Sequence, residues 1–218
     1  MQSTLNAQYS DVPQDDKYGL DPLLYNGVYY TYFIPKGTLS HPCFQSPDYL
    51  MGSAVLRGKF YPSLSLKYDL LNQQVVLQYK VENGGVKHII LSDAWLESFN
   101  LGDSHFEISA VIDSINQICQ VIGSGSIRIF YHWTKELKLD MRPGAHNYFF
   151  TPALRKAFVV TDKGASKFTG NKNLLSLLDP KIQARAKKYL SQKKINVKKA
   201  SDNTISAFLD FINAPPKK

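Results

Sequence analysis

Three pairs of lysines near the end of the chain are the residues whose type and spacing most directly predict a chemistry. They are Lys187-Lys188, Lys193-Lys194 and Lys198-Lys199. Clustered ammonium groups attract dense negative charge, such as that of nucleic acids, anionic lipid headgroups or acidic polysaccharides. The alternative is a solvated helix face, which the preponderance of Lys over bidentate Arg favours. The six lysines are the candidate anionic-surface residues, and the ligand stays unknown.

The histidines do not form a recognised metal-binding pattern. They are scattered at His41, His88, His105, His132 and His146. Asp103 and His105 could place two ligands on one strand face. Because Asp103 follows Gly102 in an evident turn, a turn carboxylate beside an ordinary histidine is the preferred interpretation. We predict no metal site and no cofactor.

Serine motifs indicate no nucleophile either. Ser191-x-x-Lys194 and Ser201-Asp202-Asn203 match two elements of the penicillin-binding and β-lactamase pattern, but they are nearly adjacent and Lys-Thr-Gly is absent. The Gly123-Ser124-Gly125-Ser126 run leads into a strand, so we interpret it as a loop and not as a phosphate site. No spacing singles out a pair of carboxylates. We identify no catalytic residue; the sequence favours a protein that is not an enzyme and leaves the question open.

Charge is distributed unevenly along the chain. The 218 residues carry a net charge of +8, and 44% of them are hydrophobic, enough for one sizeable core. From Ala153 onward there are 15 basic and 4 acidic side chains, against 11 and 14 before it. The aromatic residues lie in the nearly neutral strands and not in the basic segment, which disfavours nucleic acid as the partner.

Two cysteines, Cys43 and Cys119, match no metal spacing, and the sequence leaves open whether they pair or stay as buried thiols. No apolar stretch approaches the ~20 residues of a membrane helix, so no transmembrane segment is expected. No signal peptide is visible, and whether Met1 replaces a cleaved one is open.

The pattern before residue 170 predicts a β-rich domain over 21–169, preceded by a flexible polar arm over 1–20. We expect a first strand in 25–33, an irregular proline-rich connection, and a β-meander within 52–106. Alternating apolar residues place one face of its strands inward, at Leu64, Leu66, Tyr68 and Leu70 and then at Val75, Leu77, Tyr79 and Val81. The segment 108–122 is ambiguous between strand and short helix. Further strands are expected around 127–133, 148–151 and 156–161, with a polar turn near 142–144.

The period changes to that of a helix in 170–214, a basic segment that we expect to pack on the same domain. Asn171 is expected to cap a first helix, Asp179-Pro180 to open a second, and Ser201 or Asp202 to open a third that stops before Pro215. The third helix carries its apolar stripe at Ile205, Phe208, Leu209 and Ile212.

The order of these elements resembles a family of uncharacterised exported β-rich proteins of Bacteroidota whose function is not established. The matching motifs include Tyr25-Asn26-Gly27, His41-Pro42, Gly52-Ser53, the run from Gly58 to Tyr61 and the run from Leu66 to Leu70, followed by Ile90-Leu91, Phe99, Phe106 and the ending from Tyr148. The resemblance covers roughly residues 25–214. It implies export across the inner membrane and a β-rich fold with C-terminal helices, and it transfers no catalytic residue.

The sequence thus predicts an α+β fold: antiparallel strands in a curled sheet, barrel-like or sandwich, with two or three C-terminal helices packed on them. We expect a non-enzymatic binding or assembly module of the bacterial cell envelope, located in the periplasm or at the outer membrane, whose partner is another envelope protein. The alternatives are a hydrolase acting on an envelope polymer, or binding of an anionic polymer or nucleic acid through the basic helices. The sequence pattern predicts neither the oligomeric state nor the order of the strands in the sheet.

Overall fold

Most of the chain forms one antiparallel sheet with helices at one end. The computed structural model describes residues 21–25, 27–31, 34–81, 84–112, 115–142 and 147–215. The predicted arm over 1–20 lies outside them, as do Pro143 and Gly144 of the predicted turn and His146. The α+β prediction is confirmed: a ten-stranded open sheet carries three helices near the C-terminus, and a short one precedes it.

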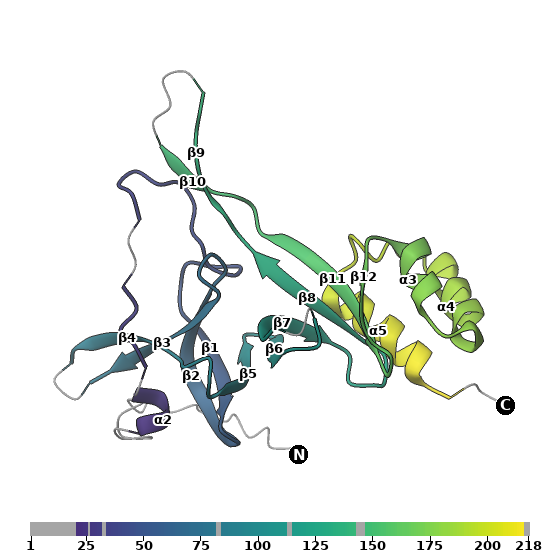
Figure 1. The fold of residues 1–218 in the computed structure, drawn as a ribbon, viewed down its shortest axis with the longest axis horizontal. Helices are drawn as coiled ribbons and strands as arrows, with labels where there is room; N and C mark the ends of the chain where they lie inside the picture. The colour runs from purple at the N-terminus through teal and green to yellow at the C-terminus, as the bar shows by residue number, and fades with distance from the viewer. Residues whose placement is uncertain are drawn as a thin grey trace, which may run out of the picture.

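The first six strands build one half of the sheet: β1 (Leu50–Leu56), β2 (Lys59–Asp69), β3 (Gln74–Lys80), β4 (Val86–Ile90), β5 (Leu96–Leu101) and β6 (Ser104–Ser109). The other half consists of β7 (Gln117–Ile122), β8 (Arg128–Thr134), β11 (Leu154–Thr161) and β12 (Gly164–Phe168). Between β8 and β11, the short strands β9 (Leu137–Leu139) and β10 (Tyr148–Phe150) pair into an arm that projects from the body (Figure 1). The sequence pattern had predicted neither β9 nor β12.

The strand order is β12-β11-β8-β7-β6-β5-β1-β2-β3-β4. The predicted meander is therefore interrupted, because β5 returns to pair with β1 on the edge that β2 leaves free. Gly52 permits this arrangement: a Cβ at that position would overlap the carbonyl oxygen of Asn100 on β5. The predicted alternation in β2 and β3 was largely correct: all of the expected inward residues are buried except Val81, which follows β3 and is partly buried. Period two fixes the face of a strand but not its neighbour.

The predicted first strand over 25–33 is wrong for the described residues. Pro22–Tyr25 form a short helix, α2, because Pro22 is suited to a first helical turn and the Asp21 carboxylate accepts a hydrogen bond from the Leu23 amide at 3.0 Å. Beyond it, only an isolated bridge joins Tyr29 to Ile89 of β4. The aromatic side chains here pack against the sheet edge; Tyr25 contacts Tyr79 edge to face.

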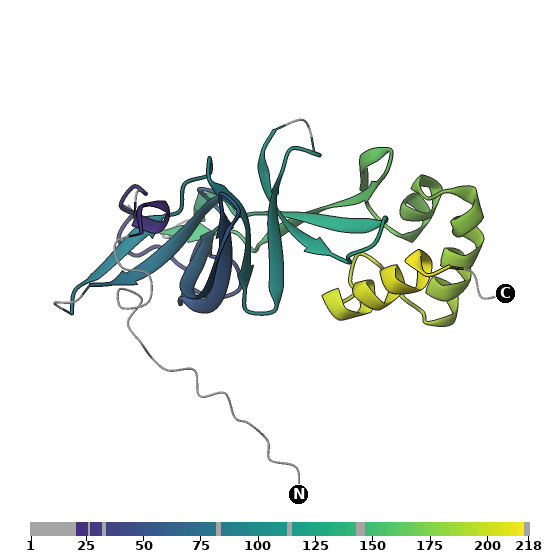
Figure 2. The ribbon, with the colours of Figure 1, turned by 90° about the horizontal axis from the view of Figure 1, so that it is seen from below.

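Three helices cover the other end of the molecule: α3 (Asn171–Leu177), α4 (Pro180–Gln192) and α5 (Asp202–Asn213) (Figures 1 and 2). The predicted caps of α4 and α5 are confirmed, because Asp179 accepts from the Lys181 amide at 2.8 Å and Ser201 from the Thr204 amide at 3.3 Å. The predicted Asn171 cap is wrong. Gly170 precedes α3, and the Asn171 side chain binds the backbone after α4 instead.

The sheet contributes to two main cores. The first lies among β1 to β6 and the segment around Leu24 and Phe44. The second joins β7, β8, β11 and β12 to the three helices, and it contains Ile129, Tyr131 and Val159 of the sheet together with Phe208 and Leu209 of α5. Trp133 contacts both cores and marks the seam between them. The helices are therefore fixed to the far half of the sheet by apolar packing.

Candidate binding groove on the C-terminal helices

The lysines predicted as an anionic surface all lie exposed on or after α4. Lys187 and Lys188 belong to α4, Lys193 is its C-terminal cap, and Lys194, Lys198 and Lys199 follow it. The structure separates them into two groups. Lys187 and Lys194 line a groove between α3 and α4, and the other four do not.

The groove has a volume of about 850 Å³ and an apolar floor. Leu175 of α3, Ala184 and Leu190 of α4, and Ile195 beyond it contribute carbon surface. Lys172 lines the groove from α3, Lys187 lines it from α4, and Lys194 lines it from the segment that follows α4. Sequence reasoning missed Lys172, because it is a single lysine in a short helix. Its spacing of three residues from Leu175 was the one available signal, since positions i and i+3 share a helix face.

Hydrogen bonds of two side-chain amides hold the walls of the groove together. Gln183 of α4 donates through Nε2 to the Leu175 carbonyl of α3 at 3.0 Å. Asn171 of α3 donates through Nδ2 to the Ile195 carbonyl at 2.6 Å and accepts from the Val197 amide at 2.9 Å. A groove held open before its ligand arrives loses less conformational entropy on binding.

The helical segment is strongly basic. Residues 171–215 contain nine Lys and Arg against three Asp, a net charge of +6. Asp179 caps α4, and Asp202 binds Gln120 and Arg155. Among the described residues, none of the six lysines has a carboxylate within ion-pair distance. Their charge is therefore available to an external anionic group.

Lys194 occupies a conformation that lysine seldom adopts. Its φ is 51°, in the left-handed region. The Ile195 amide donates to the Leu190 carbonyl at 2.9 Å and the Lys194 amide to the Ser191 carbonyl at 3.1 Å, which is the Schellman ending of a helix. Glycine is usual at this position, and a residue with a Cβ costs about 1 kcal/mol there. The rim of the groove thus holds a lysine at a conformational cost.

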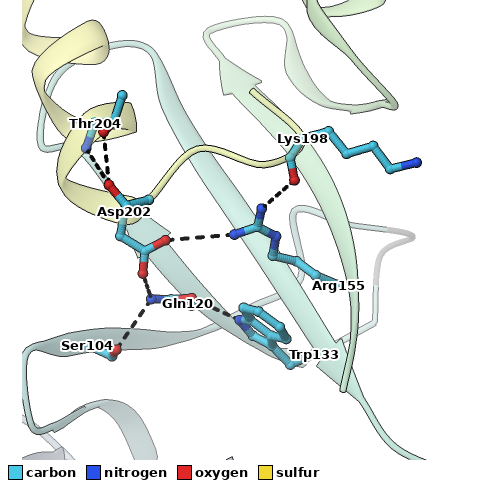
Figure 3. A network of polar contacts seen from close by, with 8 residues as sticks. Ser104, Gln120, Trp133, Arg155, Lys198, Asp202 and Thr204 are labelled. Carbon is cyan, nitrogen blue, oxygen red and sulfur yellow. Dashed lines mark hydrogen bonds and ion pairs between the residues drawn. The ribbon is translucent and has the colours of Figure 1, made fainter. Parts of the chain in front are cut away.

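A polar network fixes the start of α5 to the sheet (Figure 3). Gln120 of β7 is its centre: it donates to the Asp202 carboxylate at 2.7 Å and accepts from the Trp133 indole at 2.8 Å. Arg155 of β11 reaches the other Asp202 oxygen at 3.8 Å and donates to the Lys198 carbonyl at 3.1 Å. This network holds the loop that carries Lys198 against the sheet.

The C-terminal end of α5 is held by contacts with α4. Arg185 of α4 donates to the carbonyl of Phe211 in the last turn of α5 and, at 2.6 Å, to that of the C-cap Ala214. Tyr189 of α4 stacks on Phe211 with ring centroids 4.5 Å apart. The helices therefore form one rigid lobe, and the groove lies on the face of α4 where it meets α3.

A second hollow, of about 650 Å³, lies on the sheet face opposite the helices. Three of its lining side chains pair with one another: Arg128 reaches both carboxylate oxygens of Glu107 at 3.3 Å, and His105 lies 3.5 Å from the same carboxylate. The bond with His105, followed by the charge of Arg128, lowers the pKa of Glu107. The Gly123–Ser126 loop, which also lines this hollow, is hydrogen-bonded to α5, because the Ser126 hydroxyl donates to Asn213 at 3.2 Å.

The remaining predicted residues have structural roles. Ser191 meets Lys194 only through its backbone, and Ser201 caps α5, so the serine motifs assemble no nucleophile. Burial lowers the pKa of His41, His88 and His132. Within the described ranges, no three His, Cys, Asp or Glu side chains gather as metal ligands. Cys43 and Cys119 are buried and unpaired.

No family model, curated protein or solved structure matches this chain. Among the helices of the described residues, none is long and apolar enough to span a membrane.

Proposed function

We propose that this protein is a non-enzymatic binding module that holds an anionic partner on its C-terminal helical lobe. The observation that carries the proposal is the set of six exposed lysines without carboxylate partners among the described residues. Arginines nearby are used differently, since Arg155 and Arg185 hold the lobe together. In this part of the fold, the two arginines make structural contacts and the six lysines are exposed to solvent.

The partner that we propose is a protein and not a nucleic acid. Single-stranded nucleic acids bind where cations alternate with exposed aromatic rings. The groove between α3 and α4 has an aliphatic floor instead, and its lining side chains include no aromatic ring in the described part of the chain. An aliphatic floor between lysines suits a protein surface that combines apolar and acidic side chains.

The location that we propose is the bacterial cell envelope, with another envelope protein as the partner. Its support is the resemblance of the motifs over residues 25–214 to exported proteins. An assembly role agrees with the rigid attachment of the lobe, because a preformed surface can hold a partner without folding around it.

A cross-linking pulldown from native cells tests both parts of the proposal. The tagged protein is compared with a variant in which Lys187, Lys188, Lys193, Lys194, Lys198 and Lys199 are all replaced by Gln. A matched control replaces six exposed lysines elsewhere in the chain: Lys36, Lys80, Lys138, Lys156, Lys163 and Lys167. Envelope and soluble fractions are analysed separately.

We expect the wild type and the control to recover one stoichiometric envelope protein, and the helical variant to lose it. Recovery should also fall as salt rises, because exposed charges are screened. An unchanged set of partners in the helical variant would refute binding through the lobe. Recovery only from the soluble fraction, with nucleic acid that nuclease releases, would refute the envelope location and the protein partner.

A further inference from the structure

We infer that the groove between α3 and α4 is the docking site for an amphipathic helix of the partner, apolar on one face and acidic on both flanks. The inference rests on the proposed function and names the chemistry of its partner. It separates the lysines into those that contact this helix, Lys172, Lys187 and Lys194, and those that do not.

The shape of the groove favours an elongated occupant. Its lining on α4 runs from Pro180 through Gln183, Ala184 and Lys187 to Ser191, which is a single stripe along the helix. α4 has 13 residues, which is about 20 Å at the rise of a helix. A helix of about the same length would lie along it, with side chains at i, i+3, i+4 and i+7 entering the groove.

The chemistry of the floor requires apolar side chains from the occupant. Leu175 and Ile195 are partly exposed at the floor, and Leu190 lies below them. Covering such carbon surface contributes about 25 cal/mol per Å². The backbone of the walls is helical, so it offers no open strand edge to an extended peptide. This favours an occupant that satisfies its own backbone hydrogen bonds, as a helix does.

The lysines specify acidic residues at defined places. Lys187 of α4 and Lys194, seven residues later and just beyond the helix, line the groove on one side in sequence, and Lys172 lines it from α3. A docked helix would thus carry Asp or Glu at i and i+7 on one flank and at least one on the other.

Selection from a displayed library of random peptides about 16 residues long tests the inference on the full-length protein. We expect enriched peptides to share apolar residues at i, i+3 or i+4 and i+7, flanked by Asp or Glu. The absence of an enriched family, or a family without that pattern, would overturn it. Vesicles of anionic phospholipid and single-stranded DNA are measured in parallel.

Variants of the protein then show where the enriched peptides bind. Ala184→Trp should fill the groove and weaken binding at least about tenfold, whereas Ala207→Trp, on the exposed face of α5, should not. Likewise, the triple variant Lys172→Glu, Lys187→Glu, Lys194→Glu should abolish binding. The control variant Lys188→Glu, Lys193→Glu, Lys199→Glu should weaken it only slightly at physiological salt.

The outcomes separate this inference from the proposed function. One outcome would refute the groove and leave the basic lobe as the binding surface. In it, peptides bind the Ala184→Trp variant as tightly as the wild type but no longer bind the variant with Glu in place of Lys188, Lys193 and Lys199. Vesicles or DNA that bind with groove-dependent affinity, in place of peptides, would refute the helical occupant. Insensitivity to every lysine would refute both proposals.

Discussion

The side chain of Asn213 binds Ile127 as a neighbouring strand would. Its Oδ1 accepts from the Ile127 amide at 2.9 Å, and its Nδ2 donates to the Ile127 carbonyl at 2.9 Å. The last residue of α5 is thereby hydrogen-bonded to the residue that precedes β8. Gly125 allows the approach, because a Cβ there would overlap the Asn213 amide.

Replacing Asn213 by Ala should destabilise the protein by about 1–3 kcal/mol, because the buried amide of Ile127 loses its acceptor. The free energy of unfolding in urea measures the effect. Asn203→Ala, at an exposed position of the same helix, is the control and should change it by less than about 0.5 kcal/mol. Equal losses in the two variants would show that the pairing contributes nothing specific.

Lys194→Gly should have opposite effects on stability and binding. Glycine removes the cost of the left-handed conformation and should stabilise the fold by about 0.5–1 kcal/mol, while the loss of the ammonium group weakens binding of selected peptides. Thermal unfolding and peptide titration measure the two effects. Lys193→Gly, at the neighbouring C-cap with an ordinary φ, should not stabilise. A destabilised Lys194→Gly would contradict the assigned helix ending.

Gln120→Leu should cost about 2–4 kcal/mol, because it removes at once the acceptor of the Trp133 indole and one of the two partners of the Asp202 carboxylate. The same urea experiment measures the loss, and a change in tryptophan fluorescence should accompany it. Gln117→Leu, half-buried on the same strand, is the matched control. A shift confined to fluorescence, with stability unchanged, would contradict a stabilising role of the network.

Gly52→Ala should prevent β1 and β5 from pairing as they do, because the new methyl group would overlap the Asn100 carbonyl. We expect a loss of several kcal/mol or a failure to fold. Gly170→Ala meets no atom within 4 Å and has an extended φ of 173°, so it should be tolerated. The soluble yield and the midpoint of unfolding are compared for the two variants. If Gly52→Ala were tolerated as well as Gly170→Ala, the close approach of β1 and β5 at Gly52 would be refuted.

The two thiols should react only when the protein unfolds. Burial raises the pKa of Cys43 to about 11 and that of Cys119 to about 12, from 9.0. Both thiols therefore stay protonated in the folded chain, and the stability that they contribute is complete below about pH 9 and is lost as the pH rises toward those values. Labelling with a disulfide reagent near pH 8 should follow the unfolded fraction in urea. Fast labelling without urea would contradict this.

Local chemistry made parts of the helical lobe predictable. The caps at Asp179 and Ser201 and the apolar stripe of α5 depend on neighbours within a few residues, so the sequence contains their full cause. Asn171 shows the limit: its amide was equally suited to a local cap and to the distant backbone of Ile195, and the packing of α3 on α4 selected the second.

The sheet and the groove depended on distant partners. Nothing in the alternation of β5 distinguishes β4 from β1 as its neighbour, and the choice depends on the close approach at Gly52. The groove likewise requires the relative placement of two helices. Lys187 and Lys194 could be proposed from sequence, but Lys172 joined them only when α3 was placed beside α4.

The position of α5 has a consequence for how the chain is made. Ile129 and Val159 are synthesised before Phe208 and Ile212 of α5, which belong to the same buried cluster. At roughly 5–20 residues per second, several seconds pass between the synthesis of β8 and that of α5. Newly made chains therefore expose an apolar strip throughout that interval, and a chaperone that shields it would raise the yield of folded protein.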